Sequence, residues 1–178
     1  MKKILTAALL TALLLSLAVS AMAVTTGLGS VTSVTVTPAT ADAAGSVSVN
    51  TTMCAVTLDD EGKIVSISFD AVQPKGAFDA TGAVAGEVDA EPRTKVEKKE
   101  AYGMVGASPI GKEWYEQAAY FENWCIGKTV AEVVTTPTYD KGDGHHTTVP
   151  DDVDLKAGTT IDIGDMLKAL AKAAANAK

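Results

Sequence analysis

Two runs of alternating apolar and polar residues flank a short acidic turn, and they constrain the fold more than any other part of the sequence. Residues 46–58 and 63–72 both alternate with a period of two, which is typical of strands that bury one face. The turn between them ends in Gly62, which can adopt a positive φ. The sequence therefore predicts a β-hairpin. One face of its second strand is expected to hold Val65, Ile67, Phe69 and Ala71.

The helices that the sequence predicts all follow the strands. Residues 109–126 predict an aromatic-rich helix that Ser108 caps and Gly127 ends. Its buried stripe is expected to consist of Trp114, Ala118, Phe121 and Cys125. A capping box at Thr129 predicts a short helix, and residues 164–177 predict a last one. The buried face of the last helix is expected to hold Leu167, Leu170, Ala171 and Ala174.

Strands followed by helices are typical of an α+β fold rather than of alternating βαβ units. We expect an antiparallel β-hairpin or sheet covered by the aromatic-rich helix and the C-terminal helix. Along the chain this gives three parts: a cleaved signal peptide over residues 1–23, an N-terminal strand and linker over 24–45, and a single α+β domain over 46–178. The strand of the second part is predicted from the β-branched residues 31–36.

The first 23 residues have the pattern of a secretory signal peptide. Lys2 and Lys3 form a basic tip, an apolar run follows over residues 4–19, and Ala-Met-Ala at 21–23 is a small-x-small cleavage site. The apolar run is short for a membrane span, and it ends in that cleavage site. We therefore expect the protein to be exported to the cell envelope or the extracellular space, with no membrane span after processing.

Charge and cysteine content narrow the possible partners. The chain has a net charge of −7, and removal of Lys2 and Lys3 makes it more negative. Nucleic-acid binding and docking on anionic lipid both require a positive surface, so neither is expected. Cys54 and Cys125 are the only cysteines. In an oxidising compartment they either form a disulfide or remain buried free thiols.

A stretch that resembles a phosphate-binding P-loop precedes the aromatic-rich helix. Residues 106–112 match its first seven positions, but Glu113 stands where a Ser or Thr would hold magnesium. A carboxylate there repels phosphate, and Pro109 removes an amide from a loop that works by donating amides. We therefore interpret the stretch as a helix start. No motif of a nucleophilic enzyme is found, so no catalytic residue is assigned.

Three further groups each have a functional and a structural interpretation. His145 and His146 lie among aspartates that either hold a divalent ion or form a solvated acidic loop; the spacing is not that of an EF-hand. A basic cluster either receives a phosphate or is a solvated face. It consists of Arg93, Lys95, Lys98 and Lys99. Three rings off the buried stripe of the helix either stack on a flat ligand or pack: Tyr115, Tyr120 and Trp124.

Two stretches together resemble the extracytoplasmic FMN-binding domains. Residues 56–67 are similar to their hairpin, in which a strand, an acidic turn with Gly-Lys-Ile and a second strand follow one another. Residues 154–160 read Asp-Leu-Lys-Ala-Gly-Thr-Thr, where that family has Asp-x-x-Ser/Thr-Gly-Ala-Thr before a C-terminal helix. The chain departs from this motif at two positions. Ala157 replaces the Ser or Thr, and Thr159 replaces the Ala.

The resemblance implies a cofactor and a site. In that family the last Thr of the motif receives FMN through a phosphoester bond that a flavin transferase forms. The implied cofactor-binding residues are Asp154, Gly158, Thr159 and Thr160, with Thr160 in the attachment position. The implied function is that of an exported flavin carrier for electron transfer outside the cytoplasm, or of a relative that has lost its flavin.

Two alternatives stand beside this interpretation. Residues 159–163 are also consistent with an edge strand whose Asp162 caps the last helix, rather than with a phosphate site at that helix start. The alternative function is a non-catalytic binding module, whose Tyr120 and Trp124 recognise a peptide, a glycan or a partner protein. The sequence leaves the ligand, the partner and the oligomeric state open.

Overall fold

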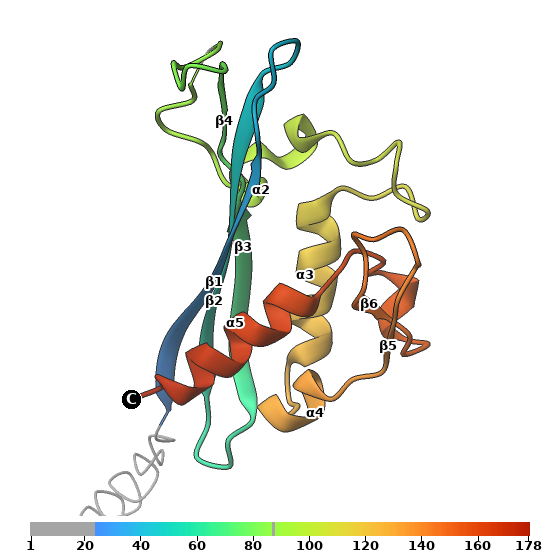
Figure 1. Cartoon of the computed structure of the whole chain (residues 1–178). Helices are drawn as coiled ribbons and strands as arrows, with labels where there is room; N and C mark the ends of the chain where they lie inside the picture. The colour runs from blue at the N-terminus through green and yellow to red at the C-terminus, as the bar shows by residue number, and fades with distance from the viewer. Residues whose placement is uncertain (1–23, 87) are drawn as a thin grey trace, which may run out of the picture.

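One antiparallel sheet forms the centre of the molecule. The computed structural model describes residues 24–86 and 88–178, so the predicted signal peptide lies outside the described residues. The strands run in the order β1 (Thr25–Thr37), β2 (Gly45–Leu58) and β3 (Ile64–Val72), and β4 (Lys75–Phe78) pairs with β2 beyond the end of β3. The helices lie against one face of this sheet (Figure 1). The predicted α+β class is confirmed.

The predicted hairpin is present, and a bulge changes which of its side chains are buried. The β2–β3 register shifts between Thr57 and Leu58, so that Leu58 pairs with Ile64. This shift turns Val65 outward, where it is 44% exposed, and buries Ile64 completely. The assignment of Val65 to the buried face was therefore wrong. The assignments of Ile67, Phe69 and Ala71 are confirmed.

The segment over residues 24–45 belongs to the same sheet. β1 pairs with β2 without interruption, from Thr25 opposite Leu58 to Thr37 opposite Ser46. The break that begins at Pro38 is the connection of this long hairpin rather than a linker between two parts. The far end of the hairpin projects beyond the helices α3 (Trp114–Cys125) and α5 (Gly164–Ala175) (Figure 1).

The aromatic-rich helix α3 is shorter than predicted. It begins five residues later than residue 109, because Gly111 adopts φ +61° and residues 108–111 form a turn. Ser108 caps no helix; its hydroxyl accepts hydrogen bonds from Lys112 N and from Gln117 Nε2. The predicted stripe is buried, and Phe121 stacks on Phe69 of β3 with ring centroids 5.3 Å apart. Gly127 follows the helix with φ +80°.

The remaining elements are short. They are α2 (Lys95–Lys98), the 3-10 turn η1 (Lys99–Tyr102), α4 (Val130–Val134), the paired β5 (Thr138–Tyr139) and β6 (Val149–Pro150), and the 3-10 turn η2 (Leu155–Ala157). The capping box predicted at Thr129 is present at the start of α4. No strand forms over residues 159–163; Asp162 Oδ1 accepts a hydrogen bond from Gly164 N at the start of α5. None of the described helices is long and apolar enough to cross a membrane.

Helix α5 lies directly on the backbone of β1. A Cβ atom added at Gly27 would stand 1.9 Å from Ala173 O, and one at Gly29 would stand 2.3 Å from Ala169 O. The buried residues of α5 are Gly164, Met166, Leu167, Ala169, Leu170 and Ala173. The assignments of Leu167 and Leu170 are confirmed, whereas Ala171 is exposed and Ala174 only half-buried, so their placement on the buried face was wrong.

Both cysteines are buried free thiols in the core between sheet and helices. Burial raises the pKa of Cys54 to about 12 and that of Cys125 to about 12. Since the thiolate is the reactive form, both thiols are chemically inert in the folded state.

Candidate functional site

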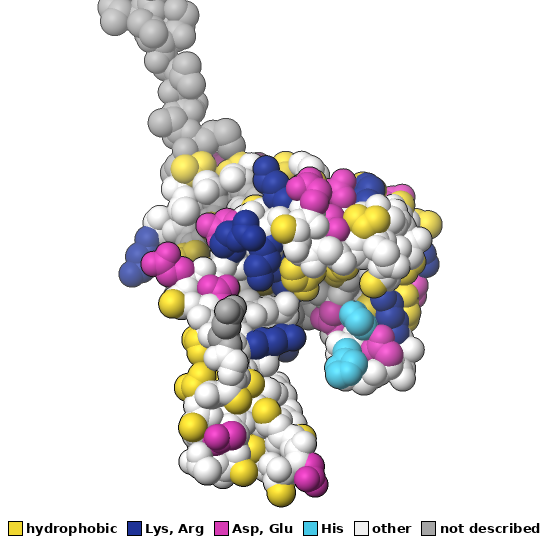
Figure 2. All heavy atoms as spheres, turned by 90° about the horizontal axis from the view of Figure 1, so that it is seen from above, with side chains coloured by type: hydrophobic (Ala, Val, Ile, Leu, Met, Phe, Trp, Pro, Cys, Tyr) yellow, Lys and Arg dark blue, Asp and Glu magenta, His cyan; other side chains and the backbone are white. Residues whose placement is uncertain are grey.

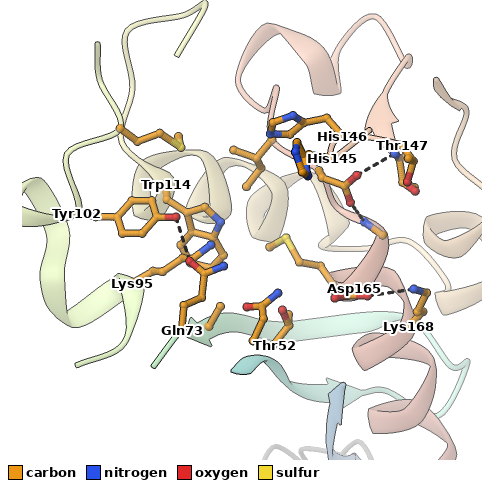
Figure 3. A pocket seen from close by; sticks show the side chains of 18 residues that line it. Thr52, Gln73, Lys95, Tyr102, Trp114, His145, His146, Thr147, Asp165 and Lys168 are labelled. Carbon is orange, nitrogen blue, oxygen red and sulfur yellow. Dashed lines mark hydrogen bonds and ion pairs between the residues drawn. The ribbon is translucent and has the colours of Figure 1, made fainter. Parts of the chain in front are cut away.

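A cavity of about 380 Å³ opens between the middle of the sheet, the segment that follows α2, the loop before β6 and the start of α5 (Figure 3). In Figure 2 it forms part of the hollow between the projecting hairpin and the lobe that carries the two histidines. Ligand sites in proteins are concave spaces of about 300–1,000 Å³, so this one has room for a small ligand. Its charged and aromatic lining includes Lys95, Tyr102, Trp114, His145, His146 and Lys168.

Lys95 is the most unusual group in the cavity. Its Nζ lies 5.0 Å from the ring centroid of Tyr102 and 5.1 Å from that of Trp114, within the range of cation–π attraction. Among the described residues it forms no ion pair, whereas Lys168 in the same cavity is paired with Asp165 at 3.0 Å. Burial, aided by the positive charge of Lys98, lowers the pKa of Lys95 to about 8. The carboxylate of Asp70 partly offsets this by raising the pKa, but it forms no ion pair with Lys95. A desolvated cation without a paired carboxylate favours an anion beside it.

The sheet contributes a hydrogen-bond acceptor that has no donor. Asn50 and Thr52 lie on the face of β2 that lines the cavity. Asn50 Oδ1 is buried, and it is the only such side-chain atom without a hydrogen-bond partner among those of the described residues. Unpaired buried polar atoms are uncommon because each costs about 1–3 kcal/mol. Asn50 lines the cavity, but its Oδ1 atom is itself buried and is not presented to the cavity surface.

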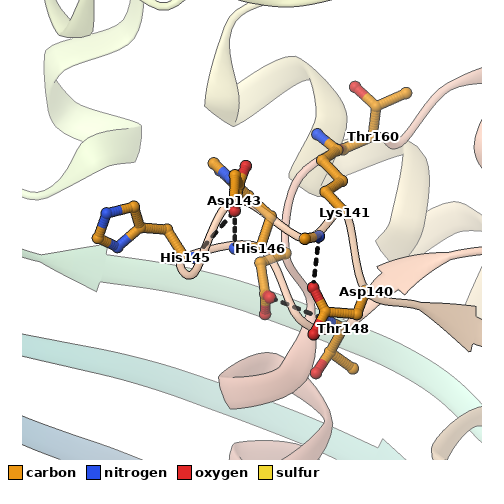
Figure 4. Close-up of polar contacts among 9 residues, drawn as sticks. Asp140, Lys141, Asp143, His145, His146, Thr148 and Thr160 are labelled. Atoms are coloured by element: carbon orange, nitrogen blue, oxygen red, sulfur yellow. Dashed lines mark hydrogen bonds and ion pairs between the residues drawn. The ribbon is translucent and has the colours of Figure 1, made fainter.

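The histidine loop forms the opposite wall. The N–H groups of His145 and His146 donate to Asp143 Oδ1, and Nδ1 of His146 lies 2.7 Å from Asp143 Oδ2 (Figure 4). These hydrogen bonds lower the pKa of Asp143. No group of three or more His, Cys, Asp or Glu side chains that could hold a metal ion occurs in the described part of the chain. Asp143 thus orders the loop that brings both imidazoles to the cavity.

The four residues implied by the family resemblance lie together, but outside the cavity lining. They lie against helix α3. A Cβ atom added at Gly158 would stand 2.2 Å from the ring of Tyr120, and the Tyr120 hydroxyl donates a hydrogen bond to Asp154 O. Thr159 is fully buried, and its hydroxyl donates to Gln117 O. Thr160 N donates to Gln117 Oε1 at 2.8 Å, and Thr160 Oγ1 lies 3.2 Å from the same atom.

Gln117 fixes this segment to the rest of the protein. Its side chain is fully buried, and Nε2 donates to Ser108 Oγ and to Lys112 O while Oε1 accepts from Thr160. The residues that follow Thr160 in sequence, Ile161 and Asp162, line the cavity. The segment over residues 154–160 therefore anchors one wall of the cavity, although its own side chains do not face into it.

The stretch that resembles a P-loop has a structural role. Glu113 is 3% exposed, and its carboxylate accepts hydrogen bonds from Met104 N and Val105 N. The acidic side chain thus holds the segment after η1 against the start of α3. Met104 and Trp114, which adjoin these contacts, both line the cavity.

The three aromatic rings off the buried stripe of α3 all have partners. Tyr115 donates to Glu100 Oε1, and Tyr120 packs against Gly158. Lys128 Nζ lies 4.0 Å from the ring centroid of Trp124. These contacts favour the packing interpretation of the rings.

Part of the chain is similar in sequence to a known protein. No family model matches the chain, and no solved structure matches it. A stretch of 95 residues is 38% identical to part of a protein named chlorophenol reductase from Desulfitobacterium hafniense. The match covers 47% of this chain and 29% of the relative. The similarity therefore spans less than a third of that protein, and the reductase activity is a property of that protein as a whole.

Proposed function

We propose that this protein is an exported binding domain that holds a planar, phosphate-bearing molecule, with FMN as the candidate, in the cavity lined by Lys95. The observation that carries the proposal is the Lys95 ammonium group, which has no ion-pair partner among the described residues and lies beside two aromatic rings in the cavity. The family resemblance supports the same ligand class. The lining offers a cation for the phosphate and the aromatic side chains of Tyr102 and Trp114 beside it. Its two carboxylates already have partners, Asp162 in the amides of Thr148 and Gly164 and Asp165 in Lys168.

The chain's own residues fit a flavin in chemical type. Trp114 and Tyr102 place aromatic side chains beside Lys95, the Lys95 ammonium group is the donor for anionic oxygens, and Asn50 adds a polar side chain to the lining. When bound, FMN would supply one- or two-electron transfer, which is the chemistry that an electron carrier outside the cytoplasm needs. The proposed site is non-covalent, since Thr160 is outside the lining and its hydroxyl is hydrogen-bonded to Gln117.

Titration of the processed apoprotein with FMN tests this proposal, with the visible flavin band and tryptophan fluorescence as readouts. We expect saturable binding at one site. Replacing Lys95 with methionine should weaken binding about tenfold, because the loss of one charge-assisted hydrogen bond to an anion is worth roughly 1.4 kcal/mol. Lys98→Met is the matched control, because Lys98 lies on the same helix and carries the same charge but does not line the cavity. This variant should change the affinity for FMN little.

Two results would contradict the proposal. The first is the absence of FMN binding at millimolar concentration. The second is an equal loss of affinity in Lys95→Met and Lys98→Met, which would indicate a general charge effect. Thr160→Ala distinguishes the two modes of attachment: unchanged affinity and an unmodified intact mass agree with the non-covalent site, whereas an added FMN mass that this variant loses would place the attachment at Thr160.

The affinity should depend on pH through Lys95. Its pKa in the unliganded protein is about 8, so the ammonium form predominates below this pH and is lost as the pH rises through it. An anionic ligand binds the ammonium form, so the affinity for FMN should decrease from pH 7 to pH 9.5, the decrease centred above pH 8 because the bound anion raises this pKa. Isothermal titration across this range is the measurement, and Lys95→Met should show a flat profile.

Export is tested by the mass of the mature protein. An intact mass that corresponds to residues 24–178 in the culture medium or the cell envelope is the expected result. The full-length chain in the cytoplasm would contradict it.

A further inference from the structure

Strand β1 forms one edge of the sheet, and α5 covers only half of that edge. Because the register with β2 is unbroken, backbone N–H and C=O groups face the free edge at every second residue, those with even numbers. Thr26 N and O are hydrogen-bonded to Lys178, Leu28 O accepts from Asn176, and Ser30 O accepts from Lys172. The C-terminal end of α5 and the residues after it therefore hydrogen-bond to both outward groups of Thr26 and to the carbonyls of Leu28 and Ser30.

The same edge is open beyond Ser30. The next residues whose backbone groups face outward are Thr32, Val34 and Val36, and no other described residue hydrogen-bonds to these groups. All side chains from Thr32 to Thr37 are exposed, Val34 at 61% and Val36 at 59%. This part of β1 belongs to the end of the hairpin that projects beyond α3 and α5 (Figure 1), so both the edge and the valine-bearing face are accessible.

The sequence of the open edge lacks the features that normally prevent strand pairing. Charged side chains, prolines and bulges block exposed edges in most sheets. Residues 32–37 are Thr-Ser-Val-Thr-Val-Thr, which is β-prone and uncharged, and the first proline is Pro38. Across both strands of the hairpin, residues 24–58, the only charged side chain is that of Asp42 at the turn.

We propose that this open edge pairs with the same edge of a second copy of the chain. The pairing is antiparallel about a two-fold axis at Val34, so that Val34 faces Val34 and Thr32 faces Val36 of the other copy. The three residues with outward backbone groups then form about six intermolecular hydrogen bonds, and the valines of both copies lie on one face of a continuous sheet.

The lack of charge on the edge allows a second copy to pair with it despite the net charge of the protein. The protein has a net charge of −7, so two copies repel one another over most of their surfaces. The hairpin is the neutral part at which they can approach, and the antiparallel arrangement places the two acidic bodies at opposite ends of the paired strands. A basic partner would gain no electrostatic attraction from an uncharged edge. The pairing is small, so we expect a weak and reversible dimer.

Sedimentation equilibrium of the processed chain, over concentrations up to the millimolar range, tests the pairing. The parent protein should show a reversible monomer–dimer equilibrium. Val34→Lys should raise the dissociation constant by at least about tenfold, because it places two like charges opposite one another across the axis. Leu28→Lys adds the same charge to the same strand and face, 67% exposed but outside the paired segment, and should leave the equilibrium nearly unchanged.

Cross-linking locates the axis and keeps the test independent of folding effects. Val34→Cys should give a disulfide-linked dimer on mild oxidation, since facing residues in antiparallel strands lie within disulfide range and both native thiols are buried. Leu28→Cys should remain largely monomeric. A parent protein that is monomeric at every concentration would overturn the proposal, even if its edge pairs with a strand of another protein. A dimer that Val34→Lys does not weaken, or equal cross-linking of both cysteine variants, would also overturn it.

Discussion

Replacing Gly27 with alanine is expected to destabilise the protein by about 3 kcal/mol or more, which is a large part of the total stability of a domain of this size. The added Cβ would stand 1.9 Å from Ala173 O and 2.9 Å from Ala173 C. These are backbone atoms of α5, so no side-chain rotation relieves the contact. The helix has to move away from β1, and its buried contacts with the sheet are weakened. Urea denaturation followed by circular dichroism measures the effect.

Gly106→Ala is the matched control for this prediction. A Cβ at Gly106 would meet no atom within 4 Å, and its φ is not in the left-handed region. The substitution should change the free energy of unfolding by less than about 0.5 kcal/mol. If Gly27→Ala were as stable as Gly106→Ala, the direct contact between α5 and the backbone of β1 would be refuted.

The second large effect is expected for Gln117→Leu, which should cost roughly 3 kcal/mol. Leucine has a similar volume, so the loss comes from hydrogen bonds rather than from a void. The substitution leaves Thr160 N and Lys112 O without these partners in a partly buried environment, where an unpaired group costs up to about 1–3 kcal/mol. Denaturation in urea again gives the magnitude, and exchange of the Thr160 amide proton should accelerate at the same time.

Asn123→Leu provides the comparison on the same helix. Asn123 is exposed, and its side chain donates only to Ala119 O. This variant should lose less than about 0.5 kcal/mol. A similar loss in both variants would mean that Gln117 acts through helix propensity and does not anchor the segment over residues 154–160.

The fold was largely predictable because its strongest signals are local. Each of these signals can be recognised from a short stretch of sequence: the apolar–polar alternation on both sides of the turn at residues 59–62, the capping box at Thr129 and the apolar stripe of α3. The errors arose where one residue changes the geometry. The bulge at Leu58 exchanges Ile64 and Val65, and Gly111 delays the start of α3. The burial of α5 also depends on its close contact with Gly27, which nothing in the helix's own sequence indicates.

The cavity was not predictable, because its walls come from segments far apart in the chain. Asn50, Lys95, Trp114, His145 and Asp165 lie on five different segments, and only the fold brings them together. Three of these residues carried a signal that stood out in the sequence. Lys95 belonged to the basic cluster, Trp114 to the aromatic helix and His145 to the histidine pair, but the sequence offered no reason to combine them.

The central claim is that the cavity around Lys95 is the place where the ligand binds. Mapping of ¹⁵N and side-chain resonances during titration with FMN tests it most directly. We expect the largest chemical-shift changes at the Trp114 indole N–H, the Asn50 side-chain amide and the backbone amides of residues 145–148, which line the cavity from separate segments. Shifts confined to the surroundings of Tyr120 and Gly158, or no shifts at saturating FMN, would contradict it.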